Sequence, residues 1–265
     1  MKRKPSAAVF FAVVTMLGFG ASAGAVGPIQ INQVTVLAAG GFPYKIKTSG
    51  SYILTSNLTN SKSTNAINVA AAQVTIDLNG FVILGPGSSV TTVTGIDASG
   101  LIGVTVENGT VSEFGTGINV GSFGIVKNLH ADYNGIGIGV GNSNLVQGCT
   151  ANHSTDSAVG ASGIFCSAEC TISGNTVTGG ASDGIVCNGF GCVISGNSAS
   201  ANTGIGISCL GSGCLISGNT ILNNADGIDA FQATTGYSGN VLNNTNHNVT
   251  GGTSLGNNLC GGTVC

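Results

Sequence analysis

The sequence is poor in charged and aromatic residues. It contains no tryptophan, four tyrosines and a single arginine, Arg3, and only 6% of its 265 residues are charged. Nucleic-acid binding relies on clustered lysine and arginine, so this scarcity argues against DNA or RNA as a partner. The lack of tryptophan leaves few flat rings on which sugars could stack, so the composition is not typical of a strong, general carbohydrate binder.

The few basic residues gather at the N-terminus. Lys2, Arg3 and Lys4 precede an uncharged apolar run at 7–20 and small residues at 21–23, which is typical of a secretory signal peptide covering residues 1–25. The run is short for a membrane span, so a retained N-terminal anchor is the less favoured alternative. No later segment is apolar and long enough to cross a bilayer. We therefore expect a secreted or periplasmic protein that is not integral to a membrane after signal cleavage.

Signal cleavage leaves an acidic chain without arginine. Three of the seven basic residues are removed, so four lysines remain against ten carboxylates, a net charge of 4 − 10 = −6. Charge is too sparse to cover the surface, and Asn, Ser, Thr and Gly must do so instead. The chain is nevertheless not typical of a disordered protein, because Ile, Val and Leu are abundant and regularly placed.

The abundant residues form a repeat. The dipeptide Gly-Ile recurs with its glycine at positions 95, 117, 137, 163, 184, 204 and 227, at intervals of 20 to 26 residues. Within each unit, apolar residues alternate with small or polar ones in short segments, which indicates very short strands. A unit of about 20 to 23 residues with three such strands cannot bury its own apolar side chains, so neighbouring units must stack.

Stacked units of this length predict an all-β solenoid, a parallel β-helix of about 8–9 coils. Each coil adds about 4.8 Å, the spacing of hydrogen-bonded strands, so the rod would be roughly 40 Å long. We expect a β-rich N-terminal cap segment at 26–65, the β-helix at 66–246 and a C-terminal cap at 247–265. Caps are needed because exposed terminal strands recruit other chains.

The phrase Ser-Gly-Asn recurs in the C-terminal repeats. Its asparagines would lie in one column: Asn175, Asn197, Asn219 and Asn240. Asparagine tolerates the left-handed backbone that a sharp turn requires, and its amide can bond to the amides one coil above and below. We favour this structural role over a ligand-binding role for the column.

The units GIVCNGFGCVISGNSASANT and GIGISCLGSGCLISGNTILNNAD resemble right-handed parallel β-helix repeats of the pectin-lyase-like superfamily. They are also similar to the repeats of carbohydrate-binding and sugar-hydrolase domains. The resemblance covers about 66–246 and implies a single-stranded, right-handed parallel β-helix. It does not assign a reaction, because one fold hosts many activities. Pectate lyases of this superfamily use arginine as the base, which the mature chain lacks, and polygalacturonase-type signatures are absent as well.

The nine cysteines of an exported chain predict disulfides. Two repeat positions hold three cysteines each, and three cannot pair off within one position. We therefore predict bridges across the turn within each coil, and one more at the C-terminus: Cys166–Cys170, Cys187–Cys192, Cys209–Cys214 and Cys260–Cys265. Cys149 remains as a free thiol, with intermolecular pairing as the alternative. We expect no metal site, because the cysteines repeat as a stack and no histidines cluster beside them.

Acidic residues concentrate near the C-terminal end. Asp183 and Asp226 precede equivalent Gly-Ile steps two coils apart, about 9.6 Å, which is near the upper limit for an inverting acid and base pair. With Asp229 they are the candidate catalytic residues. Aspartate is also a common turn residue, and we favour that interpretation. The three histidines lie in unrelated contexts, and no partner acid is evident in a neighbouring coil.

Outward positions after Gly-Ile offer a binding surface. Asn68, Asp97 and Asn119 occupy them, and their oxygens and amides could bond sugar hydroxyls or hold a Ca²⁺ ion. We favour a β-helix protein of the cell surface or envelope that associates with polysaccharide or surface glycans without catalysis. The alternatives are a hydrolase or lyase acting on an extracellular polysaccharide, and an adhesion or assembly protein.

Overall fold

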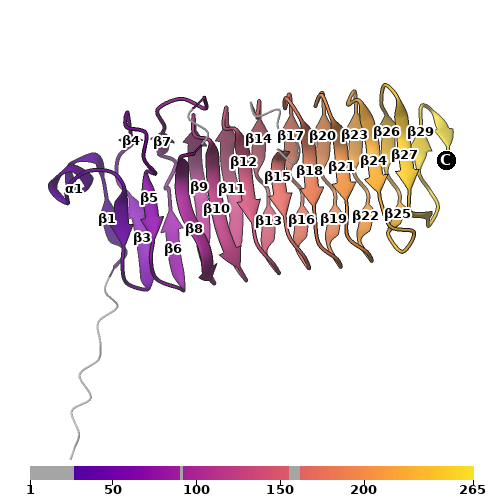
Figure 1. Cartoon of the computed structure of the whole chain (residues 1–265). Helices are drawn as coiled ribbons and strands as arrows, with labels where there is room; N and C mark the ends of the chain where they lie inside the picture. The colour runs from indigo at the N-terminus through magenta and orange to yellow at the C-terminus, as the bar shows by residue number, and fades with distance from the viewer. Residues whose placement is uncertain (1–26, 90–91, 155–161) are drawn as a thin grey trace, which may run out of the picture.

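The protein folds into one rod of stacked coils. The computed structural model describes residues 27–89, 92–154 and 162–265, and Figure 1 shows their strands side by side along the whole rod. This is the predicted all-β parallel β-helix. One of its two sheets receives a single strand from every turn and has ten strands, so the solenoid has ten turns where 8–9 were expected. The expected signal peptide lies outside the described residues.

Each turn contributes up to three short strands, which form two sheets. The ten-stranded sheet consists of β2 (Tyr44–Ile46), β5 (Ile67–Val69), β8 (Thr94–Ile102), β10 (Thr116–Ser122), β12 (Ile136–Val140), β15 (Ser162–Cys166), β18 (Asp183–Cys187), β21 (Ile205–Cys209), β24 (Asp226–Ala230) and β27 (His247–Gly251).

The twenty-stranded sheet contains two parallel ladders that share the long strands β9 (Thr105–Ser112) and β11 (Ile125–Asp132). Its first ladder adds β1 (Ile29–Ile31), β3 (Gly50–Leu54), β6 (Val74–Asp77), β13 (Leu145–Gln147), β16 (Thr171–Ser173), β19 (Val193–Ser195), β22 (Leu215–Ser217), β25 (Gly236–Ser238) and β28 (Thr253–Ser254). Its second ladder adds β4 (Leu58–Thr59), β7 (Val82–Leu84), β14 (Thr150–Asn152), β17 (Thr176–Thr178), β20 (Ser198–Ser200), β23 (Thr220–Leu222), β26 (Val241–Asn243), β29 (Leu259–Cys260) and β30 (Thr263–Val264).

The Gly-Ile step builds the core behind the ten-stranded sheet. Its isoleucines point inward and are at most 1% exposed: Ile96, Ile118, Ile138, Ile164, Ile185, Ile207 and Ile228. The glycine lies where two coils approach closely, since a Cβ on Gly117 would stand 2.6 Å from the carbonyl oxygen of Gly137. The strand pairing aligns Gly206, and not Gly204, with this series. The repeat thus reflects a tight corner followed by a buried side chain.

Both ends of the solenoid extend beyond 66–246. Before residue 66, β3 already pairs with β6 in parallel, and after residue 246, β27 pairs with β24. The short helix α1 (Gln33–Ala38) covers the N-terminal end, with Val36 buried against the first coils. At the other end β30 turns back antiparallel on β29. No helix among the described residues is long and apolar enough to span a membrane.

The Ser-Gly-Asn phrase builds a buried asparagine ladder. The Oδ1 atom of each asparagine accepts the backbone N–H of its counterpart one coil earlier, at 2.9–3.0 Å, through the series Asn175, Asn197, Asn219 and Asn240. The ladder continues to Asn258. One expectation was wrong: the left-handed backbone belongs to the preceding glycines, such as Gly196 and Gly218 at φ 63°. The asparagine is needed for its buried amide.

A second asparagine ladder lies one corner further along the coil. Asn202, Asn224, Asn244 and Asn248 are linked in the same way, from Oδ1 to the N–H of the preceding member, at 2.9–3.1 Å. Their spacing within NNAD and NNTN signals this ladder in the sequence, but we had not predicted it. Two corners of the C-terminal coils are therefore fixed by buried amides.

Candidate functional site

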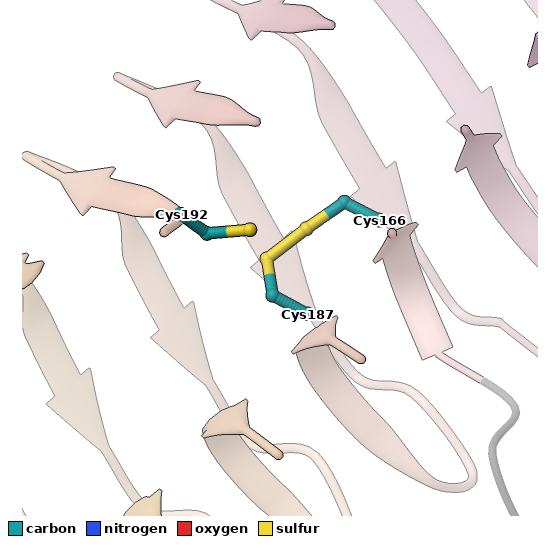
Figure 2. Close-up of side chains that lie close together, drawn as sticks. All are labelled: Cys166, Cys187 and Cys192. Carbon is teal, nitrogen blue, oxygen red and sulfur yellow. A yellow bond between two sulfur atoms is a disulfide. The ribbon is translucent and has the colours of Figure 1, made fainter. Parts of the chain in front are cut away.

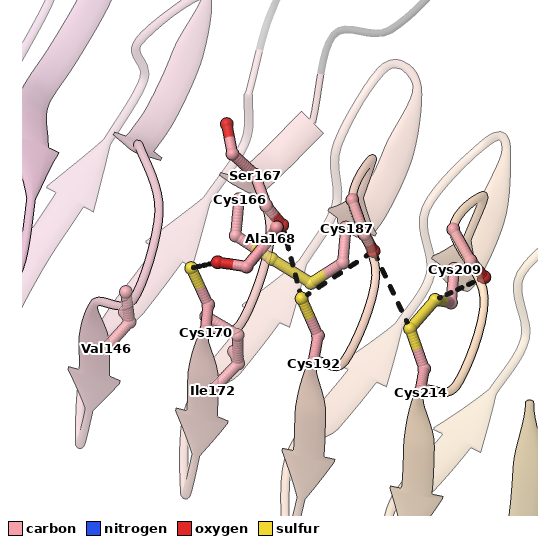
Figure 3. Close-up of a disulfide and its surroundings, with 12 residues drawn as sticks. Val146, Cys166, Ser167, Ala168, Cys170, Ile172, Cys187, Cys192, Cys209 and Cys214 are labelled. Atoms are coloured by element: carbon pink, nitrogen blue, oxygen red, sulfur yellow. Dashed lines mark hydrogen bonds between the residues drawn. A yellow bond between two sulfur atoms is a disulfide. The ribbon is translucent and has the colours of Figure 1, made fainter.

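Cysteines of three successive coils lie in two adjacent rows inside the rod (Figure 3). Two of the predicted disulfides are present: Cys209 is bonded to Cys214 across its turn, and Cys260 to Cys265 at the C-terminus. The C-terminal disulfide lies beside the β29–β30 hairpin, where the rod ends. These two bridges follow the within-coil scheme.

The other two predicted bridges are wrong. Cys166 is bonded to Cys187 in the next coil, and neither Cys166–Cys170 nor Cys187–Cys192 is formed. The reason is register: Cys166 on β15 pairs directly with Cys187 on β18, and their Cα atoms are 4.6 Å apart. Stacked counterparts in neighbouring coils are thus as well placed for a disulfide as residues facing each other across a turn.

Three buried thiols remain free, Cys149, Cys170 and Cys192. Burial raises the pKa of Cys149 to about 11, so this thiol stays protonated. A hydrogen bond between Cys170 and Cys192 raises the pKa of Cys170 and lowers that of Cys192, because the thiol of one stabilises the thiolate of the other. These groups lie in the core and present no reactive surface.

The outer face of the ten-stranded sheet carries one row of side chains, which we call the outer column. It consists of the residues that follow the inward-pointing side chain in each coil: Lys45, Asn68, Asp97, Asn119, Gly139, Phe165, Val186, Ser208, Asp229 and Thr250. All candidate binding residues lie in this row. Its two ends are polar and its middle contains Phe165 and Val186.

The N-terminal part of the outer column is held by hydrogen bonds. The Nδ2 atom of Asn65 donates to Asn68 Oδ1 at 2.9 Å and to Asp97 Oδ2 at 3.3 Å, and Asn65 itself accepts the N–H of Thr94. Asn119, in the next coil, has no side-chain hydrogen bond within the part of the chain that the structure describes, and is half-buried. The side chains of Asn68 and Asp97 are thus held in place as hydrogen-bond acceptors, and the amide of Asn119 in the next coil can both donate and accept hydrogen bonds.

The three candidate catalytic aspartates lie near one another on this same sheet. Burial raises the pKa of Asp183, whose Oδ1 accepts the N–H of Ile205 at 2.7 Å. Burial also raises the pKa of Asp229, and the charges of Asp183 and Asp226 add to this effect. The hydrogen bond to His247 lowers the pKa of Asp226. The three carboxylates are therefore close enough to interact, in environments that raise the pKa of Asp183 and Asp229 and lower that of Asp226.

His247 corrects an expectation about the histidines. It pairs in register with Asp226 one coil earlier, and its Nδ1 lies 2.9 Å from Asp226 Oδ1. A partner acid therefore does stand in a neighbouring coil, and the shared position could have been read from the repeat alignment. The other two are also engaged: His130 Nδ1 lies 2.7 Å from the hydroxyl of Thr150, and the ring of His153 stacks on an exposed tyrosine.

Two pockets mark the described surface. One, at the N-terminal end, is lined by 39–45 and Lys47, and the other lies between Phe123 and Thr171. Neither contains Asp183, Asp226 or Asp229. The three aspartates therefore line neither of these two pockets.

Fold and surface together define a disulfide-containing parallel β-solenoid with a polar outer column on its ten-stranded sheet. Within that class, the chain belongs to the family described as periplasmic copper-binding protein (NosD), whose model matches residues 72–259, that is 188 of the 265 residues. Among curated proteins, none matches the sequence.

A solved structure shares the fold at low sequence identity. The Dettilon tailspike protein superposes with a TM-score of 0.65 at 14% identity, over 88% of this chain and 54% of that one. The chain thus spans about half the length of the tailspike. The bacteriophage CBA120 tailspike protein 2 domain (TM-score 0.44, 14% identity, 84% and 38% covered) and the Azotobacter vinelandii mannuronan C-5 epimerase A-module (TM-score 0.38, 12% identity, 87% and 95% covered) are more distant.

The copper in the family description can be tested against the cysteines. Soft thiolates are the ligands that Cu(I) prefers. Among the described residues, one group of three such side chains converges: the sulfur atoms of Cys166, Cys187 and Cys192 lie within 4.8 Å of one another (Figure 2). Two of these sulfurs are joined to each other and are not thiolates, so only Cys192 could serve as a ligand. The oxidised cluster does not fit a copper site.

Proposed function

We propose that this protein is a non-catalytic, glycan-associated protein of the periplasm or cell surface, and that the glycan lies along the outer column. The supporting observation is the register that sets Asn68, Asp97 and Asn119 in three successive coils on one open face. Successive coils are about 4.8 Å apart, so a ligand that runs along the rod meets a polar side chain at each step.

The chemistry of the column suits sugar hydroxyls. Asp97 accepts hydrogen bonds, and the amide of Asn119 both donates and accepts them, as a hydroxyl does in return. The network around Asn65 fixes the first two acceptors before a ligand arrives, which lowers the entropy cost of binding. Phe165, half-buried in the middle of the column, adds an apolar surface against which a sugar ring could pack.

Polysaccharide hydrolysis is the second candidate function. It is favoured by one observation: the pKa of Asp229 is raised while that of Asp226 is lowered, and the charge of Asp226 contributes to the shift of Asp229. A carboxyl group with a raised pKa near a carboxylate with a lowered pKa is the arrangement that glycoside hydrolysis uses. The hydrogen bonds already made by Asp183 and Asp226 favour binding over hydrolysis.

One pair of measurements separates the two functions. The mature protein is applied to a glycan array, and the same polysaccharides are incubated with it and assayed for new reducing ends. Array signal that is lost in Asn119→Ala, with no new reducing ends, supports glycan binding. New reducing ends that disappear in Asp226→Asn would replace binding by hydrolysis. Absence of array signal would refute both the ligand class and the proposed surface.

A further inference from the structure

Charge is segregated along the rod. Residues 27–76 contain three lysines and no carboxylate, whereas the segment from Asp77 onward contains all ten carboxylates and one lysine, Lys127. That lysine is neutralised locally, because its Nζ lies 2.8 Å from Glu107 Oε2 on the twenty-stranded sheet. The N-terminal end therefore has a net charge of +3, and the remaining length has 1 − 10 = −9.

The three N-terminal lysines surround one pocket. Lys45 and Lys47 line the pocket of about 380 Å³ formed by the turn at 39–44. Lys62 approaches from the next coil, since its Nζ would lie 4.0 Å from a Cβ on Gly41, another lining residue. None of the three lysines forms an ion pair within the described chain. The unneutralised positive charge of the rod is thus concentrated at a single concave site, of a size typical of small-ligand sites.

The loop that carries Lys62 is held by hydrogen bonds to a buried side chain. Asn60 is fully buried, its Oδ1 accepts the N–H of Lys62 at 3.0 Å, and its Nδ2 donates to the carbonyl of Thr64 at 2.6 Å. The turn on the other side of the pocket is fixed by amides of residues 39–41, which cap the last carbonyls of α1. Both walls are therefore held in place before any ligand binds.

The pocket is continuous with the outer column. Lys45 is the first member of that column and pairs in register with Asn68, which is followed by Asp97 and Asn119. A ligand on the column thus reaches the lysines at its N-terminal end. Towards the other end it meets Asp183, Asp226 and Asp229, which repel negative charge.

We propose that this pocket is an anion site that binds the acidic group of a glycan lying on the outer column, so that the ligand is an oligosaccharide with a uronate unit at the end nearest α1. The inference rests on the proposed glycan-binding function and names the ligand class. Lysine ammonium groups donate to the carboxylate, and the neutral units of the sugar extend over Asn68 and Asn119. A second copy of the chain, docking its acidic end into the pocket, is the competing occupant.

Titration calorimetry with two matched probes tests the proposal. The probes are a trisaccharide with a single uronate unit at its non-reducing end and two neutral units, and the same trisaccharide after reduction of its carboxyl group to an alcohol, added to the mature protein at low salt. We expect the uronate-containing trisaccharide to bind at least about tenfold more tightly, because three unpaired lysines face its charge. This preference should fall steeply between about 0.05 and 1 M NaCl, as the Debye length falls to about 3 Å.

Two lysine variants, one of them a double substitution, and a control complete the experiment. Lys47→Gln/Lys62→Gln should remove the preference for the charged probe, and Lys45→Gln should weaken binding of both probes, because Lys45 also belongs to the column. Lys127→Gln, which removes the one lysine held in an ion pair elsewhere, should leave binding unchanged. Melting temperatures of all variants show whether they are folded.

The outcomes distinguish the two proposals. Equal affinity for both probes would overturn the anion site while leaving glycan binding intact. So would a loss of affinity in the Lys127→Gln control equal to the loss in the pocket variants. Inorganic sulfate that binds in the pocket while neither trisaccharide does would also overturn it. No binding of either probe, together with a silent glycan array, refutes the proposed function as well. Concentration-dependent assembly that the lysine variants abolish assigns the pocket to a second copy.

Discussion

Substitution of Asn197 by alanine should destabilise the protein by about 3 kcal/mol. The side chain is 2% exposed and makes five hydrogen bonds. Its Oδ1 accepts the backbone N–H and the Nδ2 of Asn175, and its Nδ2 donates to Ile172 O, Ser195 O and Asn219 Oδ1. Alanine removes the acceptor of a buried N–H and a donor to a buried carbonyl at once.

The magnitude follows from the groups left behind. A buried polar group without a partner costs about 1–3 kcal/mol, and the N–H of Asn175 loses its acceptor while the carbonyl of Ile172 loses a donor. Their sum, reduced by partial relaxation, is about 3 kcal/mol. Asn197→Asp should destabilise the protein at least as much, although aspartate has the same shape as asparagine. In this variant a carboxylate oxygen replaces Nδ2 and faces the carbonyl oxygen of Ile172, to which Nδ2 now donates a hydrogen bond.

Urea denaturation measures this difference. The control is Asn188→Ala, which removes an exposed asparagine from the same coil and should change the unfolding free energy by less than about 0.5 kcal/mol. If Asn197→Ala unfolds within that same margin of the wild type, the ladder contributes little and the reasoning is refuted. Stability of Asn197→Asp equal to that of the wild type would show that shape alone matters at this position.

Three further predictions concern the sulfurs and one carboxylate. Non-reducing pepsin digestion and mass spectrometry should yield a Cys166–Cys187 linked peptide; recovery of within-coil links for both residues would contradict the register argument. Cys149 should resist Ellman's reagent at pH 8 in the folded protein and react after unfolding, because burial raises its pKa to about 11; rapid labelling of the native thiol would show otherwise. Burial also raises the pKa of Asp183, so the stability it contributes is present below its unfolded pKa and is lost as the pH rises through its folded pKa. Asp183→Asn should therefore raise the melting temperature relative to the wild type more at pH 7 than at pH 3, and an equal or reversed difference would refute this sign.

The repeat determined how much of the architecture could be predicted. Gly-Ile gave the solenoid, because a glycine where coils meet and a buried isoleucine must recur in every coil that stacks. The first coil lacks this dipeptide, and Tyr44 stands where its isoleucine would be, so the parallel pairing of this coil with Ile67 was not anticipated. Counting units by one dipeptide undercounts turns whose corner is built from other residues.

Pairing within the stack was harder to predict than the stack itself. Alternation identifies which residues point inward, but Cys187 has two nearby cysteines, Cys166 in the preceding coil and Cys192 across its own turn, and the three sulfur atoms lie within 4.8 Å of one another. Sequence spacing cannot choose between them, because both are fixed by the same repeat. The contact of His247 with Asp226 was missed for a different reason: it joins residues 21 positions apart, and their equivalence appears once the last, irregular coil is included in the repeat alignment.

The outer column differs from the inward and corner positions of the coil, and this difference bears on function. Inward positions repeat Ile or Val, and the corners repeat Gly or Asn, because each coil must satisfy the same packing and hydrogen bonds. The outer column instead changes from Lys45 through Asn68 and Asp97 to Phe165, although stacking makes no different demand on successive coils there. This variation gives the outer column different successive groups to present to a ligand. A glycan with one acidic end and neutral units behind it has that sequence of groups, and the charge distribution of the rod fixes the direction in which it would lie.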